Sequence, residues 1–276
     1  MDYYPHQAQQ IVHRSEARNR VVSAGRRWGK STSLAAHEAF AQLCVPNSQL
    51  WVVAPTYDLA DKVFRVVWKL AVIQNHVPGG IRKASERERY IWTNNDARIT
   101  GKTADDPTGL VGEGLDAVIV DEAARIPRPQ LVWQECLRPA LSDRQGWSLF
   151  ISTPRGYNAF YEWWQWGQSS EMPNWASFRH PSWTNPFLAK SELEDARREL
   201  SVVRYEQEFG AQFRLHEGLV FPEFDEEKHV VNTTWVVPDL VGEKKEFERR
   251  VEAEPELKHY EGEGLGVEEL MEKLTL

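Results

Sequence analysis

The residues from Ala24 to Thr32 read AGRRWGKST, the A-x-x-x-x-G-K-S pattern of a phosphate-binding loop with Ala in place of the first Gly. In such a loop Lys30 supplies a mobile positive charge for the β- and γ-phosphates, and the Ser31 hydroxyl can bind Mg²⁺. Gly29 lets the backbone approach the phosphates closely. Backbone N–H groups of the loop and of the helix after it favour an anion at the same point. The pattern predicts a nucleotide-binding loop made of Ala24, Gly25, Arg26, Arg27, Trp28, Gly29, Lys30, Ser31 and Thr32.

A second reactive group follows an apolar run, in which Val118-Ile119-Val120 leads directly into Asp121 and Glu122. An apolar run without alternation is typical of a strand buried on both faces, whose carboxyl end opens into the ligand crevice of a doubly wound sheet. There Asp121 would hold Mg²⁺ through water, and Glu122 would orient and deprotonate the attacking water. Two acids after a strand are by themselves explained as a solvated strand end. The phosphate-loop pattern about 90 residues upstream favours the metal-and-base interpretation.

Two further stretches carry weaker signals. The apolar run Leu149–Ile151 ends in Ser152-Thr153-Pro154, whose hydroxyls can link a γ-phosphate site to the next subdomain. Taken alone, it is a strand-ending turn. Upstream of the loop, the Gln7 amide can pair a donor and an acceptor with adenine, although a polar helix start explains it equally simply.

The elements that must position these residues alternate between strands and helices. Apolar runs predict strands at Val21–Ala24, Leu50–Ala54, Ala117–Val120 and Trp147–Ser152. Helical patterns lie between them at Ser31–Leu43, Tyr57–Asn75 and Arg128–Leu137. This alternation predicts an α/β fold of the P-loop NTPase type, with a doubly wound, mainly parallel sheet and flanking helices.

The remaining patterns add local detail. Arg89–Trp92 and Ala97–Thr100 flank a turn and predict a hairpin that adds an antiparallel strand. The Gly-, Asp- and Pro-rich stretch 103–114 is expected to be a loop beside the site. Residues 191–209 predict one amphipathic helix of a small helical lid, with inward positions Leu193, Leu200, Val203 and Phe209. In the cluster of Tyr161, Trp164 and Trp166, core packing is favoured over stacking on DNA.

Bulk properties set broad limits on function. The 276 residues are 41% hydrophobic, contain two cysteines without metal-ligand spacing, and show no membrane span or secretory signal, which suggests a reduced intracellular protein. The net charge of −8 is uneven, because residues 239–276 hold 12 acids and 6 bases. The rest is nearly neutral and can carry a local basic face, so composition leaves DNA binding open.

Four stretches, PHQAQQ, GRRWGKS, VIVDEAA and FISTPRG, together resemble the ATPase domain of the large terminase subunit of tailed bacteriophages, in the order of that family. GKTADDP, GEGLD and LVFPEF also look like this family, so that the resemblance covers residues 1 to about 235. It implies an Mg²⁺-dependent ATPase that drives double-stranded DNA into a procapsid. The implied partners are other copies in a ring on a portal and a small terminase subunit. Three possibilities stay open for the nuclease: a separate nuclease from another chain, a protein that is an ATPase alone, or a diverged remnant. The implied location is the host cytoplasm.

The resemblance also assigns roles to residues. Lys30 and Ser31 would bind ATP and Mg²⁺, Glu122 would activate water and Arg26 would neutralise charge. Ser152 and Thr153 would couple γ-phosphate loss to the lid. The implied organisation is an ATPase core at 1–184, a lid and linker at 185–238, and an acidic helical or partly disordered appendage at 239–276.

The chain departs from the family pattern in three places. Its residues after about 221 show no strand-end aspartate of the kind that family nuclease domains use, so nuclease activity is not expected. Val111 stands where some members carry an Arg that acts on a neighbouring subunit, which leaves Arg128, Arg138 or Arg144 as candidates in trans. Ala24 replaces the first Gly of the loop, with little expected loss. Two alternative functions stay open: a helicase-like DNA-dependent ATPase, and a nucleotide-binding assembly protein without turnover.

Overall fold

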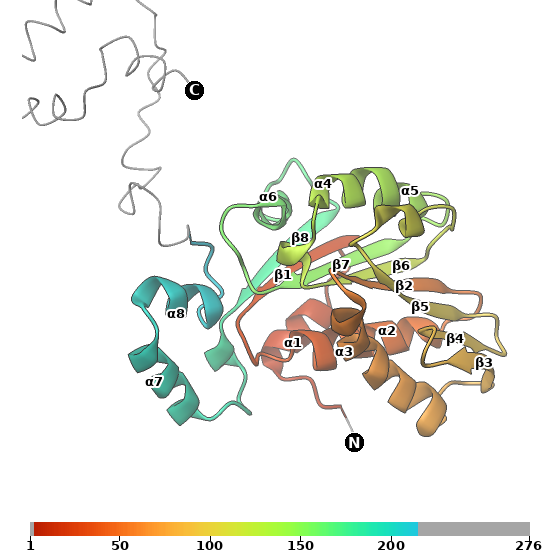
Figure 1. Ribbon diagram of the computed structural model, residues 1–276, viewed down its shortest axis with the longest axis horizontal. Helices are drawn as coiled ribbons and strands as arrows, with labels where there is room; N and C mark the ends of the chain where they lie inside the picture. The colour runs from red at the N-terminus through yellow and green to blue at the C-terminus, as the bar shows by residue number, and fades with distance from the viewer. Residues whose placement is uncertain (1–2, 215–276) are drawn as a thin grey trace, which may run out of the picture. The chain divides into compact units, whose positions relative to one another are not determined.

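The computed structural model describes residues 3–214 (Figure 1). The chain divides into two compact units, Met1–Pro222 and Glu223–Leu276. The second unit, and with it the predicted appendage and most of the predicted linker, lies outside the described residues. The domain boundaries at residues 184 and 238 therefore stay predictions.

Within residues 3–214 one sheet of eight strands has the order β3-β4-β5-β2-β6-β7-β1-β8. All neighbouring strands from β5 to β8 pair in parallel, and β4 alone runs antiparallel between β3 and β5. The strands are β1 (Asn19–Ala24), β2 (Gln49–Ala54), β3 (Ile81–Ser85), β4 (Tyr90–Thr93), β5 (Arg98–Thr103), β6 (Ala117–Asp121), β7 (Trp147–Ser152) and β8 (Trp175–His180). The parallel strands and the hairpin expected from the sequence are confirmed, whereas the edge strands β3 and β8 were not predicted.

Helices cover both faces of the sheet, as a doubly wound fold requires. In Figure 1 one face carries α1 (Gln7–His13), α2 (Ala36–Leu43) and α3 (Tyr57–Trp68), and the other carries α4 (Pro129–Leu131), α5 (Arg138–Ala140) and α6 (Ala159–Trp166). Two separate hydrophobic cores result, with Val22, Val52 and Ile119 facing the first and Val21, Val53 and Val120 facing the second. Adjacent residues of one strand thus serve opposite cores, which is why these strands read as continuous apolar runs.

Several predicted helices contain π-helical turns. Lys30–Ala35 forms such a turn and continues into α2, Lys69–Ile73 extends α3, and Val132–Leu137 joins α4 to α5. Thr56 caps α3, where its side chain accepts a hydrogen bond from the Leu59 N–H. The predicted helical segments are confirmed, since their sequence ranges are helical throughout most of their lengths.

The prediction of a single helix at 191–209 is wrong. The chain forms α7 (Lys190–Glu199) and α8 (Val202–Glu208), and the Ser201 side chain between them caps α8 by accepting from the Arg204 N–H. None of the four expected inward side chains is buried, and Val203 is 37% exposed. The physical reason is that α7 is rich in Glu and Arg and offers no continuous apolar stripe to a core.

Two other expectations are refined. The predicted loop after β5 contains a short 3-10 turn, Pro107–Leu110, whose Pro107 and Leu110 are buried. In α6 the packing role is confirmed, because Trp164 and Trp166 pack against the second core, while Trp163 is the tryptophan of this helix that is fully buried. No helix in the described part of the chain is both long and apolar enough to cross a membrane.

Candidate nucleotide-binding site

The carboxyl ends of three neighbouring strands bring the predicted site together. In the order β6-β7-β1, residue Ser23 pairs with Ser152 and residue Asp121 pairs with Ile151. The loop that follows β1 therefore lies directly over the ends of β7 and β6. This arrangement is the ligand crevice that a parallel sheet with helices on both faces provides.

Lys30 points into this crevice. Its Nζ donates a hydrogen bond to Thr153 Oγ1 at 3.1 Å and lies 3.9 Å from Glu122 Oε1. The side chain is 11% exposed, and burial lowers the pKa of its ammonium group, an effect that the charges of Glu122 and Asp121 oppose. Lys30 thus contacts the residues predicted for coupling and for base catalysis.

Ser31 and Asp121 form the predicted metal pair. Ser31 Oγ donates to Asp121 Oδ1 at 2.9 Å, and Asp121 is fully buried. Its second oxygen, Oδ2, is buried without a hydrogen-bond partner among the described residues. Burial, with the charge of Glu122 added, raises the pKa of Asp121 to about 6. A hydroxyl beside an unpaired buried carboxylate oxygen is a donor set that suits a hard cation such as Mg²⁺.

The number of protein ligands at this pair is small. No group of three or more His, Cys, Asp or Glu side chains that could hold a metal occurs in the described region. Mg²⁺ takes one or two protein oxygens and completes its shell with water and phosphate, so that Ser31 and Asp121 can hold it without further side chains.

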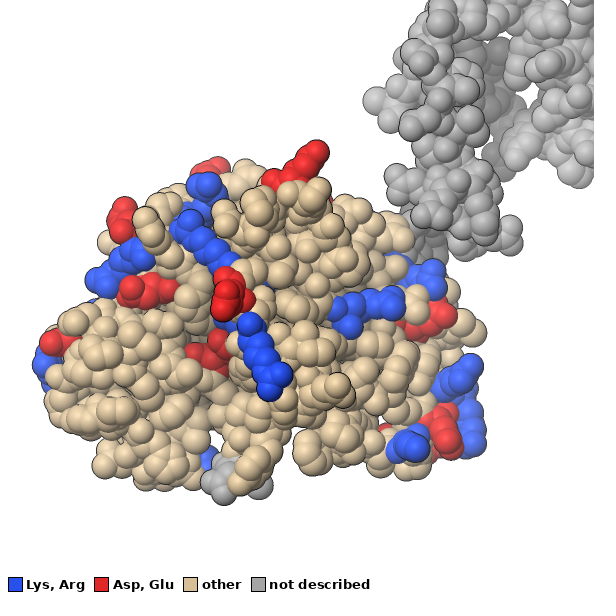
Figure 2. All heavy atoms as spheres, turned by 180° about the vertical axis from the view of Figure 1, so that it is seen from behind, with Lys and Arg blue, Asp and Glu red and all other residues tan. Residues whose placement is uncertain are grey.

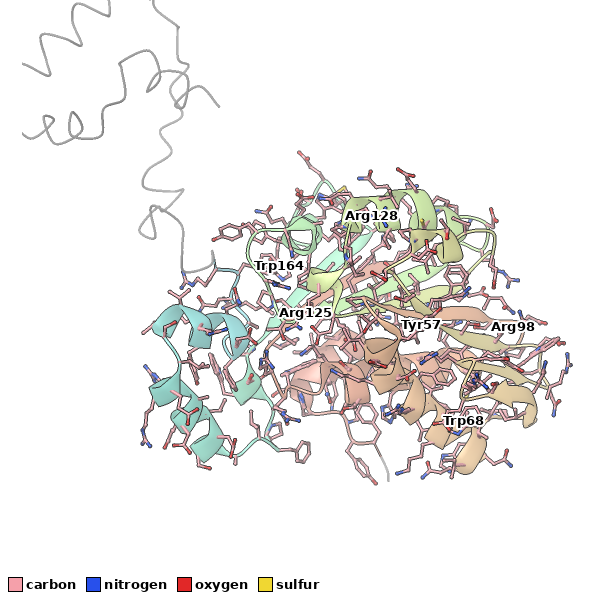
Figure 3. The ribbon with its side chains drawn as sticks, in the orientation of Figure 1. Tyr57, Trp68, Arg98, Arg125, Arg128 and Trp164 are labelled. Carbon is pink, nitrogen blue, oxygen red and sulfur yellow. The ribbon has the colours of Figure 1, made fainter. Side chains whose placement is uncertain are left out.

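Glu122 lies between two cations. Its backbone is left-handed, with φ of 52°, and its N–H donates to Asp121 Oδ1 at 3.0 Å. Its Oε2 lies 3.6 Å from Nε of Arg125, whereas Oε1 is the oxygen that faces Lys30. Figure 3 shows Arg125 near the middle of the molecule. The sequence analysis did not identify Arg125 as a partner of Glu122. Its position three residues after Glu122, in a short helical turn, is the pattern that could have indicated this pair.

The outer half of the loop contacts the chain that follows β8. Arg26 forms an ion pair with Glu208 of α8, and its N–H donates to the Glu208 carbonyl at 2.7 Å. Ser182 Oγ donates to the Arg26 carbonyl at 2.6 Å. A Cβ at Gly25 would lie 2.3 Å from Ser182 Oγ and 2.5 Å from the Phe209 carbonyl oxygen. Gly25 is therefore needed for this close approach of backbone and side chain.

The Trp28 side chain is fully buried, so a ligand cannot stack on its ring. It stacks on His180 with ring centroids 4.9 Å apart and meets His6 edge-on at 5.1 Å. Its Nε1 donates to Thr184 Oγ1 at 2.9 Å. Burial lowers the pKa of His180 to about 4, so that the stacked ring is neutral near pH 7.

A cleft of about 1330 Å³ opens over the loop, between the start of α1, the end of α3 and α7. It is lined by most of the predicted loop residues, namely Arg26, Arg27, Trp28, Gly29, Lys30, Ser31 and Thr32, together with Glu122. Gln7 is exposed and lies outside this lining, so its predicted role in adenine binding stays a prediction. Gln9 lines it instead, because the helical turn of α1 directs residue 9 inward, and its Nε2 donates to the Gly29 carbonyl at 3.4 Å.

Ser152 and Thr153, the residues predicted for coupling, lie at the end of β7. Ser152 is fully buried and its Oγ donates to the Thr153 carbonyl at 2.8 Å, while Thr153 receives the Lys30 hydrogen bond. Ala24, the residue in place of the first loop glycine, is fully buried at the end of β1.

The arginines considered for action in trans lie in different settings. Arg144 pairs with Asp116 at 3.0 Å, which occupies its guanidinium group within the same chain. Arg128 and Arg138 are exposed, and Figure 3 shows Arg128 beside α4.

A phosphate loop between β1 and α2, with strand-end acids on β6 and hydroxyls on β7, defines the P-loop class of nucleoside triphosphatase folds. The sequence profile described as "Terminase large subunit, T4likevirus-type, N-terminal" matches residues 21–228, and the chain belongs to this family.

Individual relatives agree with this assignment. The terminase large subunit of Thermus virus P23-45 is 36% identical over 253 residues, which cover 82% of this chain and 52% of that protein. The terminase large subunit of Escherichia phage T5 is 34% identical over 224 residues, covering 78% of this chain and 49% of that protein. The chain thus spans about half the length of these relatives.

Solved structures give the same result for the fold. The large terminase ATPase domain of Thermus phage P74-26 matches with a TM-score of 0.66 and 36% identity, over 76% of this chain and 94% of that domain. The large terminase of a thermophilic bacteriophage, in complex with ADP, matches with a TM-score of 0.62 and 18% identity, over 82% of this chain and 57% of that one.

Proposed function

We propose that this chain hydrolyses ATP to power the movement of double-stranded DNA into a viral procapsid. The observation that carries the proposal is the convergence of two hydrogen-bonded pairs, Lys30 with Thr153 and Ser31 with Asp121, at the carboxyl edge of the sheet. Membership of the terminase large-subunit family, and the likeness to a large terminase ATPase domain, support it.

Ser31 and Asp121 are the residues that would hold Mg²⁺. When bound, Mg²⁺ neutralises charge on the β- and γ-phosphates. The buried Asp121 Oδ2, which has no partner among the described residues, is the atom that fits this role.

The chain's own residues perform the remaining work. In this structure Lys30 contacts Thr153 and Glu122. When Lys30 binds the phosphates, its ammonium group breaks these two contacts. Glu122 then orients and deprotonates the attacking water, while Arg125 holds the other side of its carboxylate. Arg26 lines the cleft and neutralises charge as the γ-phosphate departs.

Coupling to movement follows from the two sides of the loop. Thr153 responds to the position of Lys30, and Ser152 fixes the Thr153 backbone. The segment with α7 and α8 is attached to the same loop through Glu208 and Ser182. A change at the phosphates therefore reaches both the sheet and the lid.

The wider proposal includes partners that act on the whole assembly: double-stranded DNA, other copies in a ring on a portal, a small terminase subunit and a nuclease supplied by another chain. The proposed location is the host cytoplasm, with transient attachment to the procapsid. The family and the relatives' names support these partners in kind.

The deciding experiment measures ATP turnover by the full chain with and without duplex DNA, beside the variant Glu122→Gln. We expect turnover that depends on Mg²⁺, is lost in the variant and rises when duplex DNA is added. Binding of ATP without turnover would instead support the assembly-protein alternative. Turnover stimulated by single strands and not by duplex would support the helicase-like alternative.

A further inference from the structure

Among residues 3–214, no α-helix packs on one face of the sheet at β3 and β4, and at β5 this face is met by the 3-10 turn Pro107–Leu110. In β4 and β5 burial alternates, so that Ile91 and Ile99 are buried in the first core with α3. The intervening residues Tyr90, Trp92 and Arg98 point to the opposite face and are only partly buried. The second core, which lies on that opposite face, draws no residue from β3, β4 or β5.

Cations stack on aromatic rings across this face. The guanidinium groups of Arg82 and Arg98, from the strands on either side of β4, lie over the Trp92 ring at 4.9 and 4.7 Å from its centroid. Lys83 Nζ lies 5.4 Å from the Tyr90 ring centroid. Lys102 Nζ lies 4.7 Å from that of Trp51. We call Arg82, Lys83, Arg98 and Lys102 the basic sheet face.

Most of these charges are uncompensated. Arg82 pairs with Asp96 at 2.6 Å, but Lys83, Arg98 and Lys102 form no ion pair with any acidic side chain of residues 3–214. Arg89, on the α3 side of the same strands, shows the contrast: it stacks on Tyr57 at 4.5 Å and is also paired with Asp61 at 2.6 Å. Arg89 holds β4 to α3, whereas Lys83 and Arg98 of the basic sheet face have no acidic partner within residues 3–214, and Lys102 Nζ donates to the Gly109 carbonyl at 3.2 Å.

This face lies at one end of the sheet, which β3, β4 and β5 form. Figure 3 shows Arg98 on the side of the molecule away from α7 and α8. Figure 2, which views the molecule from behind, shows Lys and Arg interspersed with Asp and Glu. Because the chain has a net charge of −8, it can attract a polyanion only through a local basic surface.

We infer that the basic sheet face binds the phosphate backbone of duplex DNA. Stacking holds each cation near a fixed ring, so less side-chain entropy is lost when its N–H groups contact a phosphate. The rings themselves are covered by cations, which favours backbone contacts over stacking on exposed bases. Contacts of this kind are independent of base sequence, as a motor that moves a whole genome requires. This inference rests on the proposed function, since DNA is the proposed cargo.

The test uses the full chain with the paired substitution Lys83→Gln and Arg98→Gln. A matched control, Arg14→Gln with Arg197→Gln, removes the same charge from two exposed arginines that form no ion pair within residues 3–214, one at the end of α1 and one on α7. Binding of a fluorescent duplex of random sequence is measured by anisotropy over a series of salt concentrations, and ATP turnover without DNA is measured for each protein.

We expect the paired substitution to weaken duplex binding at least about 10-fold at low salt, and to reduce the slope of log Kd against log salt by about 2. Lys102→Gln alone is expected to reduce the slope by about 1. The control variant is expected to show nearly the wild-type slope of log Kd against log salt, because its lost charges lie away from the basic sheet face. Turnover without DNA stays unchanged in all variants, and circular dichroism confirms that they are folded.

Equal slopes in the wild type and both β-strand variants would overturn the inference, and so would an equal loss in the control. Weakened self-association with unchanged duplex binding would overturn it in favour of a contact between copies. A wild type that hydrolyses ATP but does not bind duplex would also overturn it, leaving the ATPase proposal intact. Loss of duplex binding in the variants, with no ATP turnover in any protein, would support this face and contradict the ATPase proposal.

Discussion

The two halves of the phosphate loop face different parts of the molecule. The inner half, Lys30 and Ser31, contacts side chains at the ends of β6 and β7. The outer half, from Gly25 to Trp28, contacts the chain that follows β8, through backbone groups and a buried ring. The inner contacts are replaceable by phosphate and Mg²⁺, whereas the outer contacts are main-chain hydrogen bonds, ring packing and the Arg26–Glu208 ion pair. Apart from Arg26, which also lines the cleft, the inner half is proposed for chemistry and the outer half attaches the segment after β8, so substitutions in the two halves should fail in different ways.

The strongest effect is expected at the inner half. Lys30→Ala should abolish productive ATP binding, because the phosphates lose the buried cation that faces them. Isothermal titration with a nonhydrolysable ATP analogue measures this, and the melting temperature without nucleotide should change little. Near-normal nucleotide affinity in a folded Lys30→Ala protein would contradict the assigned loop.

Glu122→Gln should separate binding from chemistry within the inner half. We expect ATP affinity close to that of the wild type and turnover at least about 100-fold slower, the usual scale for losing a general base. Single-turnover hydrolysis measures the effect. Asp121→Asn is the matched neighbour, and it should instead raise the Mg²⁺ concentration needed for half-maximal turnover. If both variants showed the same Mg²⁺ dependence, the two acids would not have separate roles.

The outer half should respond through stability. Gly25→Ala places a Cβ 2.3 Å from Ser182 Oγ, so we expect a loss of about 1–3 kcal/mol in the free energy of unfolding, as for other overpacked sites. Urea denaturation measures it. Gly109→Ala is the control, since nothing lies within 4 Å of its added Cβ. Equal unfolding curves for the two variants would show that Ser182 and Phe209 do not pack on the loop.

The smallest effect is expected from the ring beneath the outer half. The pKa of His180 is lowered from 6.5 to about 4, first by burial and then by the neighbouring His6. In the unfolded chain His180 binds a proton as the pH falls below about 6.5, whereas in the folded chain it binds one only near pH 4. The free energy of unfolding therefore decreases as the pH falls through this range. We expect a loss of about 1–2 kcal/mol, reduced because the ring is partly solvated.

The measurement for this prediction compares the free energy of unfolding at pH 7 and pH 4.5 for the wild type and His180→Phe, which keeps a ring to stack on Trp28. The variant should lose less stability between the two pH values. A steeper loss in the variant than in the wild type would place the titrating group elsewhere.

The same division explains what the sequence could predict. The inner half and the acid pair are contiguous motifs on apolar strands, so Lys30, Ser31, Asp121 and Glu122 were assigned from spacing alone. The outer contacts join residues far apart in sequence, such as Arg26 with Glu208, and no local pattern marks them.

Local errors have local causes. Gln9 rather than Gln7 contacts the loop, because two residues along a helix the side chain points in a different direction, and at position 9 it points inward. The edge strand β8 was missed because its sequence, WASFRH, carries polar and charged residues that a central strand would not. The break between α7 and α8 falls at Leu200-Ser201, where the serine cap outweighs the helical pattern around it.

The attachment of the segment after β8 to the loop is made in part by main-chain groups. The N–H groups of Gly25 and Arg26 donate to the carbonyls of His180 and Glu208, and within the segment the N–H of Ser182 donates to the carbonyl of Phe209. Main-chain bonds are indifferent to which side chains the residues carry. The outer surfaces of α7 and α8 can therefore vary in sequence while these main-chain bonds to the loop persist. A chimaera that keeps residues 180–185 and 206–211 and exchanges the helices between them should still be a joined, folded unit.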